Sequence, residues 1–261
     1  MSTTHTTFDI DGPRATLTFD RPEARNAMTW EMYEALVAAC DRVDGDAAIR
    51  VMVLRGAGGK AFIAGTDISQ FQNFRTPDDG IGYEKRLDLV LDRLERATKP
   101  TIAQVEGVAA GGGCAIALCC DLRVATPAAT FGVPIARTLG NCLSADTCSR
   151  MIAMMGPARF KELMFTGRLM PADEAHALGL VNRIAEASDI ERVTQELAAE
   201  IASRAPLTIR AIKELTRRLL EKQRLAPGAD ADMIALCYTS EDFREGVKAF
   251  VEKRAPRWQG R

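Results

Sequence analysis

Apolar and polar positions in the first part of the chain predict strands and helices in turn. Residues Ala15–Phe19 alternate small or polar with apolar side chains, as a strand does, and the pattern stops at Asp20-Arg21-Pro22. A helix is expected next, capped by Thr29, with an apolar stripe of Tyr33, Leu36, Val37 and Cys40. The apolar run Ile49–Leu54 predicts another strand. The order strand, helix, strand favours an α/β fold.

The middle of the chain continues this plan. A polar segment, Gln70–Gly82, is rich in Gln, Asn, Asp and Pro and predicts a mobile loop. It precedes a helical pattern whose apolar positions are Leu87, Val90, Leu91 and Leu94. The apolar run Thr101–Val108 predicts a strand that ends before Gly111-Gly112-Gly113.

From Pro206 onward the pattern is helical only. Its apolar faces consist of Ile209, Ile212, Leu215 and Leu219, and then of Phe243, Val247, Phe250 and Val251. We therefore expect an α/β core over residues 1–200 and a helical region over residues 201–261.

Composition narrows the class of protein. The 261 residues carry 34 basic and 35 acidic side chains, a formal charge of −1, and no basic stripe, so nucleic acid is not an expected partner. The longest weakly polar stretch, Thr101–Cys120, contains Gln104, Glu106 and four glycines, and the N-terminus lacks the regions of a signal peptide. We expect a soluble, cytoplasmic protein that does not enter a membrane.

Cysteine and histidine usage restricts the chemistry further. Seven cysteines without a C-x-x-C motif are typical of a reducing compartment. The two histidines, His5 in a polar tail and His176 in a helical pattern, do not form a ligand cluster with the cysteines. We therefore predict no metal site, and no Ser-His or Cys-His pair for nucleophilic catalysis.

Two glycine-rich junctions follow predicted strands. Residues Gly56–Ala61 satisfy the loose G-x-G-x-x-G/A pattern of dinucleotide sites, but Phe62-Ile63-Ala64-Gly65 follows where a helix should start, which favours a tight turn. The segments Ala64–Asp67 and Gly111–Cys114 place small residues where backbone N–H groups are free. Two such donors could stabilise an oxyanion or enolate, or the small residues could serve close helix–sheet packing.

Four segments resemble the crotonase superfamily, also called the enoyl-CoA hydratase/isomerase family, over nearly the whole chain. They are RPEARNA (21–27), KAFIAGTDI (60–68), KPTIA (99–103) leading through Glu106-Gly107 to GGGC (111–114), and EGVKAFVEKR (245–254). The resemblance implies a spiral of β-β-α units with a C-terminal helical trimerisation region, in homotrimers or dimers of trimers. It implies acyl-CoA thioesters as substrates, with coenzyme A as part of the substrate and no separate cofactor.

The resemblance also assigns residues. The thioester oxygen would lie between the N–H groups of Thr66 and Gly112. Positions that match residues near coenzyme A in the family are Arg25, Lys60, Ala64, Asp67, Ile68, Phe250 and Lys253. Ordinary surface charge and core packing are the alternative for Lys60 and the tail residues, and Glu23 stands where relatives often have lysine.

The sequence departs from the family where hydratases activate water between two glutamates. Ala115 occupies the first position, and Ile135 the second, or Ala136 if the register shifts by one residue. From Leu122 through Ala145 there is no Asp or Glu, so no small shift restores a general base. Hydration by the two-glutamate route is therefore disfavoured.

Other candidate groups remain near the expected pocket. They are Arg137, Thr138, Asn141, Cys142, Ser144, Asp146 and Asp67. Asp146 is a candidate catalytic residue, with a helix N-cap or surface position as the alternative, and Asp67 is expected to cap the next helix. Asp121 matches a structural aspartate of the family, and Cys142 without a histidine is a weak nucleophile.

The leading hypothesis is an acyl-CoA enzyme that stabilises a thioester enolate and performs isomerisation, decarboxylation, dehalogenation or thioester hydrolysis. Decarboxylation forms the enolate without a base, and Arg137 could orient the departing carboxylate. A catalytically silent acyl-CoA binder or assembly partner is the alternative, and a nicotinamide oxidoreductase is a distant third.

Overall fold

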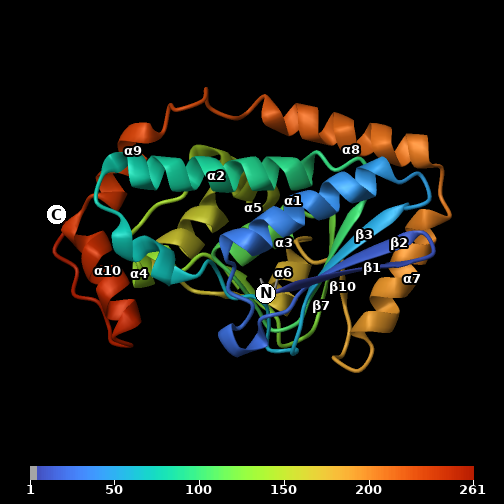
Figure 1. Cartoon of the computed structure of the whole chain (residues 1–261), viewed down its shortest axis with the longest axis horizontal. Helices are drawn as coiled ribbons and strands as arrows, with labels where there is room; N and C mark the ends of the chain where they lie inside the picture. Colours follow the sequence, from blue (N-terminus) through green and yellow to red (C-terminus); the bar gives the residue numbers. More distant parts are fainter. Residues whose placement is uncertain (1–4) are drawn as a thin grey trace.

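The computed structural model describes residues 5–261, in which two sheets lie among the helices (Figure 1). The larger sheet has the order β1-β2-β3-β5-β7-β10, with β1 (Thr6–Asp11), β2 (Arg14–Phe19), β3 (Val51–Gly56), β5 (Thr101–Val105), β7 (Leu122–Ala125) and β10 (Arg183–Ile184). The smaller sheet has the order β4-β6-β8-β9, with β4 (Ala61–Ile63), β6 (Val108–Ala110), β8 (Thr130–Gly132) and β9 (Met170–Pro171). All pairings are parallel except β1 with β2 and β8 with β9.

The same β-β-α unit repeats along the chain. Each unit gives its first strand to the larger sheet and its second strand to the smaller one, and a helix follows. The units are β3-β4 with α2 (Pro77–Glu95), β5-β6 with α3 (Gly112–Cys119), and β7-β8 with α4 (Ile135–Thr138) and α5 (Ala145–Thr166). The chain thus winds as a spiral between two sheets, which confirms the predicted fold.

Strand β3 explains how the larger sheet is covered on both faces. Val51 and Val53 point to one face, where they pack with Ile190 and Leu197 of α7 (Ile190–Ala202). Met52 and Leu54 point to the other face and join the main core with α1 (Trp30–Gly45). Because both faces are buried, the strand reads as a continuous apolar run in the sequence.

The structure corrects two sequence predictions. Thr101–Val108 is not one strand, because Gly107 has φ +66° and a Cβ there would lie 2.1 Å from the Lys60 carbonyl oxygen, so the chain turns between β5 and β6. Gln70–Gly82 is not a loop: it contains most of the 3₁₀ helix η2 (Ile68–Asn73) and the start of α2. Thr76 and Asp79 form the capping box of α2, and such capping residues have the composition of a loop.

The C-terminal part is helical, as predicted. It comprises α8 (Pro206–Glu221), α9 (Ala231–Tyr238) and α10 (Glu241–Val251), and the expected division at residue 200 falls in the last turn of α7. Helix α8 crosses the top of the molecule in Figure 1, and α10 lies at the lower left, packed against η2 and α4. No helix within residues 5–261 is long and apolar enough to cross a membrane.

Candidate active site

Three loops meet at one edge of the smaller sheet. Strands β4, β6 and β8 are parallel, so their carboxyl ends lie at the same edge, where ligands of parallel sheets commonly bind. Ala64–Asp67 follows β4, Gly111–Gly113 follows β6, and the segment leading to Ile135 follows β8. The Gly111 N–H donates to the Gly132 carbonyl at 2.9 Å, which joins the second and third loops. The structure therefore brings together the glycine-rich segments that the sequence singled out.

Asn26, in the turn before α1, holds strand β4 and the turn that leads into it, just ahead of the first of these loops. It is fully buried with φ +57°, and its Nδ2 donates to the carbonyls of Ala57 (3.0 Å) and Ala61 (2.8 Å). Its Oδ1 accepts the Arg21 N–H at 2.9 Å. Sequence reasoning gave Asn26 no role, although an asparagine between a strand and an apolar helix is a residue type that tolerates a left-handed turn.

The backbone on either side of Asn26 pairs with the Ala64–Asp67 loop itself. The Arg25 carbonyl accepts the Ala64 N–H at 3.0 Å, and the Met28 N–H donates to the Gly65 carbonyl at 2.8 Å. The Asp67 N–H donates to the Met28 carbonyl at 2.9 Å. These three bonds use the backbone groups on both sides of Thr66. Within residues 5–261 the Thr66 N–H has no acceptor.

Asp67 is committed to structure. It caps η2 by accepting the Ser69 N–H at 3.1 Å, as predicted, and it pairs with Arg21 at 2.8 Å. Burial raises its pKa, but the hydrogen bonds from Ser69 and Arg21 outweigh burial and lower the pKa overall. Asp67 is therefore an ionised carboxylate whose oxygens are already bonded to Ser69 and Arg21, and its ion pair holds the loop in place.

Gly112 provides the second free N–H. It is the first residue of α3, so its N–H has no partner inside the helix, and no other acceptor exists for it in the part of the chain that the structure describes. The next glycine explains the close approach of helix and strand, because a Cβ on Gly113 would lie 2.2 Å from the Ile63 carbonyl oxygen. The dipole of α3 adds positive potential at this end. Such an arrangement can stabilise negative charge on a carbonyl oxygen.

Hydroxyl and aromatic side chains surround this point. Thr66 Oγ1 hydrogen bonds with the hydroxyls of Tyr33 and Tyr83, and burial raises the pKa of both tyrosines, so they stay protonated. Sequence reasoning placed Tyr33 only in the apolar stripe of its helix. The hydrophobic cluster around Tyr83 is formed by Trp30, Phe71, Phe74, Tyr238 and Phe243.

The two positions at which the resemblance led us to expect the glutamates of a hydratase are buried and apolar. Ala115 on α3 is 5% exposed and Ile135 on α4 is 8% exposed. A buried carboxylate on α2, Glu84, accepts hydrogen bonds from the Tyr238 hydroxyl (2.5 Å) and the Ser144 N–H (3.0 Å). Burial raises the pKa of Glu84 to about 8.

Arg137 and Asp146 remain predictions. Arg137 is exposed on α4, where its Cβ lies against Gly167. Asp146 is half-buried in the first turn of α5, and it is not the N-cap, because Ser144 accepts the Thr147 N–H in that role. Among residues 5–261 neither side chain makes a hydrogen bond or ion pair.

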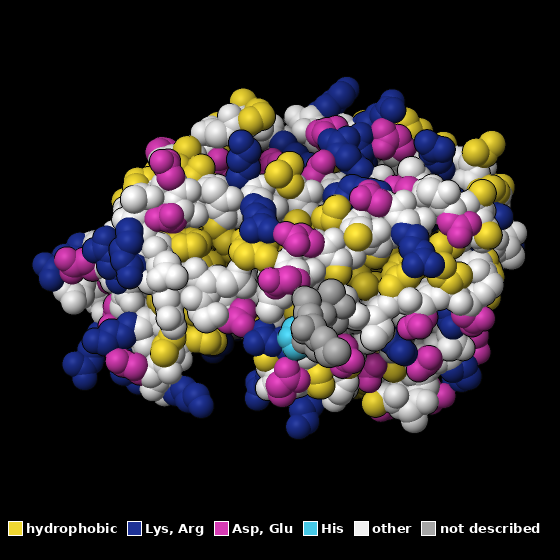
Figure 2. Space-filling model, viewed as in Figure 1, with side chains coloured by type: hydrophobic (Ala, Val, Ile, Leu, Met, Phe, Trp, Pro, Cys, Tyr) yellow, Lys and Arg dark blue, Asp and Glu magenta, His cyan; other side chains and the backbone are white. Residues whose placement is uncertain are grey.

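The residues predicted near coenzyme A lie on the surface around this edge. Arg25 and Lys60 are exposed, Ala64 and Ile68 are half-buried, Phe250 is 52% exposed on α10, and Lys253 follows that helix. Figure 2 shows a notch at the lower left, between the surface formed by α10 and the rest of the molecule. A hollow of about 370 Å³ between η2 and α10 carries three cations that the sequence did not suggest, Arg75, Arg244 and Lys248.

Other sequence candidates are structural. Asp121 accepts from the Thr101 N–H (2.7 Å) and from Lys213 (2.5 Å), as expected of a structural aspartate. The Gly56–Ala61 segment is a turn between β3 and β4 with no helix after it, so the dinucleotide interpretation is wrong. A hydrogen bond with Cys237 and burial raise the pKa of Cys142, which makes it a poor nucleophile.

Comparison with known proteins gives consistent matches. The family model described as Enoyl-CoA hydratase/isomerase matches residues 13–261. The chain is 32% identical to the short-chain-enoyl-CoA hydratase of Clostridium acetobutylicum, over 97% of both chains. It superposes on methylmalonyl-CoA decarboxylase in complex with 2-nitronate-propionyl-CoA with a TM-score of 0.89 at 29% identity, over 98% of this chain and 99% of that chain. For an enoyl-CoA hydratase of Geobacillus kaustophilus the TM-score is 0.77 at 35% identity, over 98% of both chains.

Proposed function

The chain belongs to the enoyl-CoA hydratase/isomerase family, whose substrates are acyl-CoA thioesters, and we propose that it decarboxylates a malonyl-type (2-carboxyacyl) CoA thioester. The observation that carries this proposal is the pairing of two free N–H groups, on Thr66 and Gly112, with apolar side chains at Ala115 and Ile135. The site can therefore stabilise an enolate but lacks the two carboxylates that would activate water.

Decarboxylation needs only what this site contains. The bond between Cα and the carboxylate carbon breaks, carbon dioxide leaves, and the electron pair moves into the thioester as an enolate. The N–H groups of Thr66 and Gly112 donate to the enolate oxygen, and the enolate Cα then takes up a proton from solvent water. Arg137 orients the carboxylate before it leaves, and it is free to do so because no described residue pairs with it.

Similarity of the backbone supports the same reaction. The TM-score is 0.89 with the decarboxylase at 29% identity, but 0.77 with the Geobacillus kaustophilus hydratase at the higher identity of 35%. The course of the whole chain thus follows the decarboxylase more closely, although more of its residues match the hydratase.

The test is mass spectrometry of the purified protein with malonyl-CoA and methylmalonyl-CoA, and with crotonyl-CoA as the reference for hydration. We expect loss of carbon dioxide from a 2-carboxyacyl thioester and little hydration. Rapid hydration of crotonyl-CoA would contradict the proposal, and binding of all thioesters without turnover would favour a silent binder. Arg137→Ala should lower turnover, with the exposed Arg192→Ala as control; undiminished turnover would remove the role of Arg137.

We further propose that the chain forms a homotrimer or a dimer of trimers through its C-terminal helices, and that Arg25, Lys60, Phe250 and Lys253 hold coenzyme A. The support for assembly is the apolar face of α8, where Ile212, Leu215 and Leu219 are 57–64% exposed. Leu215→Glu should lower the mass measured by light scattering. An unchanged mass would exclude this face from the interface.

A further inference from the structure

Three buried hydroxyls form a chain beside the two free N–H groups. The Tyr33 hydroxyl lies 2.8 Å from Thr66 Oγ1, and Thr66 Oγ1 lies 2.9 Å from the Tyr83 hydroxyl. Tyr33 comes from α1, Thr66 from the loop after β4, and Tyr83 from α2, so three separate elements converge here. All three residues are buried, with at most 8% of their surface exposed.

Counting hydrogens shows that this chain is incomplete. Three hydroxyls carry three hydrogens, but the two contacts between them use only two. Neither tyrosine hydroxyl has another acceptor among residues 5–261, so one hydroxyl hydrogen is left without a protein acceptor. Burying an unused donor is unfavourable, and such a group in a native structure calls for a reason.

The position of Gly112 indicates which end of the hydroxyl chain lies next to the free N–H groups. A Cβ built on Gly112 would lie 2.6 Å from the Tyr33 hydroxyl oxygen and 3.3 Å from Thr66 Oγ1. The Tyr83 hydroxyl is not among the three atoms nearest to that point. Tyr33 is therefore the end of the hydroxyl chain next to the residue that supplies one of the two free N–H groups.

We propose that the Tyr33 hydroxyl is a third donor to the thioester oxygen, beside the N–H groups of Thr66 and Gly112. This inference rests on the proposed function, because it requires the thioester oxygen to bind at that point. A bound oxygen would set one direction of donation, from Tyr83 to Thr66, from Thr66 to Tyr33, and from Tyr33 to the enolate oxygen. Each bond in such a series polarises the next.

The chemistry of the site gives this donor a purpose. Ala115 and Ile135 place no charged group there, so the donors available to the enolate oxygen in this inference are backbone N–H groups and a hydroxyl. Burial raises the pKa of Tyr33, which keeps its proton in place as a hydrogen-bond donor. The glycine at position 112 is required for the same reason, since any side chain would fill the space in front of the Tyr33 hydroxyl.

The matched variants Tyr33→Phe and Tyr83→Phe each remove one hydroxyl from the same chain. We expect Tyr33→Phe to lower kcat by about 100-fold, the usual effect of losing an oxyanion donor, with a much smaller change in KM. Tyr83→Phe should lower kcat by about 10-fold at most, because the chain loses the polarisation that Tyr83 provides while Tyr33 keeps its own hydrogen. Equal losses in both variants would show that the hydroxyl chain is only structural and would overturn the inference.

A binding measurement separates this inference from the proposed reaction. The probes are propionyl-CoA and 2-nitronate-propionyl-CoA, whose nitronate spreads negative charge onto the thioester. The ratio of their Kd values measures the preference for the nitronate, to which its own oxygens and the charge on the thioester oxygen both contribute, and the change of this ratio in Tyr33→Phe reports the contribution of the Tyr33 hydroxyl without any turnover. Tyr33→Phe should reduce this preference by about 10- to 100-fold and leave the Kd of propionyl-CoA nearly unchanged, which also shows that the variant is folded.

The outcomes are then distinct. If the wild-type protein does not decarboxylate a malonyl-type thioester but Tyr33→Phe still loses preference for the nitronate, the reaction is wrong and the donor is right. If the wild-type protein decarboxylates and Tyr33→Phe keeps both kcat and the preference, the reaction is right and the donor is wrong.

Discussion

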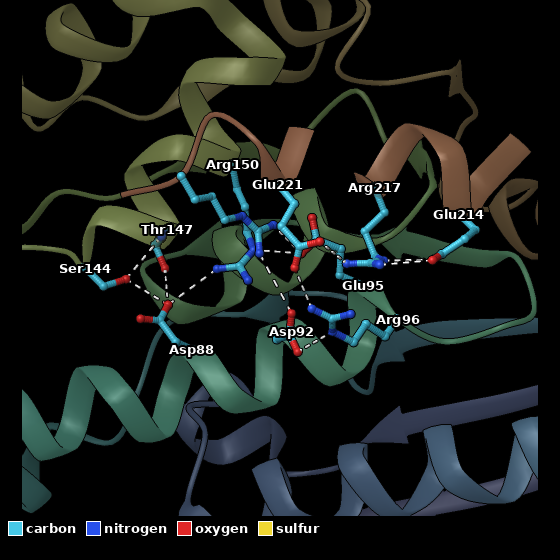
Figure 3. Close-up of polar contacts among 11 residues, drawn as sticks. Asp88, Asp92, Glu95, Arg96, Ser144, Thr147, Arg150, Glu214, Arg217 and Glu221 are labelled. Atoms are coloured by element: carbon cyan, nitrogen blue, oxygen red, sulfur yellow. Dashed lines mark hydrogen bonds and ion pairs between the residues drawn. The ribbon is translucent and has the colours of Figure 1, made fainter. Parts of the chain in front are cut away.

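The candidate active site and the contact between α2, α5 and α8 use opposite kinds of polar chemistry. The site around Thr66 and Gly112 works with backbone N–H groups and neutral hydroxyls. The contact between the helices is a network of charged side chains, which we call the α2–α5–α8 ion network (Figure 3). Its members are Asp88, Asp92, Glu95, Arg96, Arg150, Glu214, Arg217, Glu221 and Arg224.

The two regions differ in how many of their polar groups have partners within the protein. In the network every charge has an opposite charge nearby: Arg150 lies 3.2 Å from Glu95, and Glu95 lies 2.5 Å from Arg224. Such pairs satisfy one another and hold α2, α5 and the stretch around α8 together. In the site, the hydroxyls of Tyr33, Thr66 and Tyr83 bond to one another, but two backbone N–H groups and one hydroxyl hydrogen have no acceptor among residues 5–261. The first arrangement stabilises the fold, and the second is suited to bind a ligand.

Gly112→Val breaks the site without touching the network. A Cβ there would meet the Tyr33 hydroxyl at 2.6 Å, so we expect loss of at least about 10³-fold in kcat as donors are displaced. The control is Gly82→Ala in α2, where a Cβ meets nothing within 4 Å and helix propensity favours alanine. Turnover assays of both variants give the comparison. Full activity of Gly112→Val would place the reaction elsewhere.

Arg150→Ala breaks the network without touching the site. Its side chain is 7% exposed and pairs with Asp88 and Glu95, so its removal leaves the half-buried Asp88 without an ion pair and Glu95 with Arg224 alone, which should cost about 2 kcal/mol in urea unfolding. Arg192→Ala is the control, because its pairs with Asp189 and Glu196 are exposed and should be worth less than about 1 kcal/mol. The kcat of both folded variants should match the wild type. A selective loss of kcat in Arg150→Ala would contradict the division between the two regions.

The sequence predicted the site where local motifs define it. The glycine-rich segments after β4 and β6 were predicted to act together, and parallel pairing of those strands does bring them to one edge. The absence of glutamate at Ala115 and Ile135 is readable from the sequence alone. The spiral fold was predicted from the resemblance of four segments to the crotonase superfamily. The strand and helix pattern by itself predicted only an α/β fold.

The sequence could not predict contacts between distant elements. Tyr33 has the spacing of a core residue, and only the fold shows that its hydroxyl meets Thr66, 33 positions away. The same holds for the pairing of Arg150 with Glu95, and for the hollow between η2 and α10. The prediction of a loop at Gln70–Gly82 was wrong for a different reason, because helix caps and loops use the same polar residues.

Glu84 on α2 lies between the two regions, because Tyr83 of the site precedes it and Asp88 of the network lies one turn further along the helix. Its charge state shows to which region it belongs. Burial raises the pKa of Glu84 to about 8, so between about pH 5 and 8 the unfolded chain releases a proton that the folded chain retains. Compared with Glu84→Gln, the wild-type free energy of unfolding should fall by at most about 1.4 kcal/mol per pH unit in this window.

Urea unfolding of the wild type, Glu84→Gln and Tyr238→Phe at pH 5, 6.5, 8 and 9 measures this difference. Tyr238→Phe should extend the fall to higher pH, because the Tyr238 hydrogen bond lowers the pKa that burial raises. Parallel pH profiles for the wild type and Glu84→Gln would mean that Glu84 is ionised in the folded protein and belongs with the charged network. A fall in wild-type stability with rising pH, together with an unchanged kcat in Glu84→Gln, would instead make Glu84 a neutral support of the aromatic cluster behind the site.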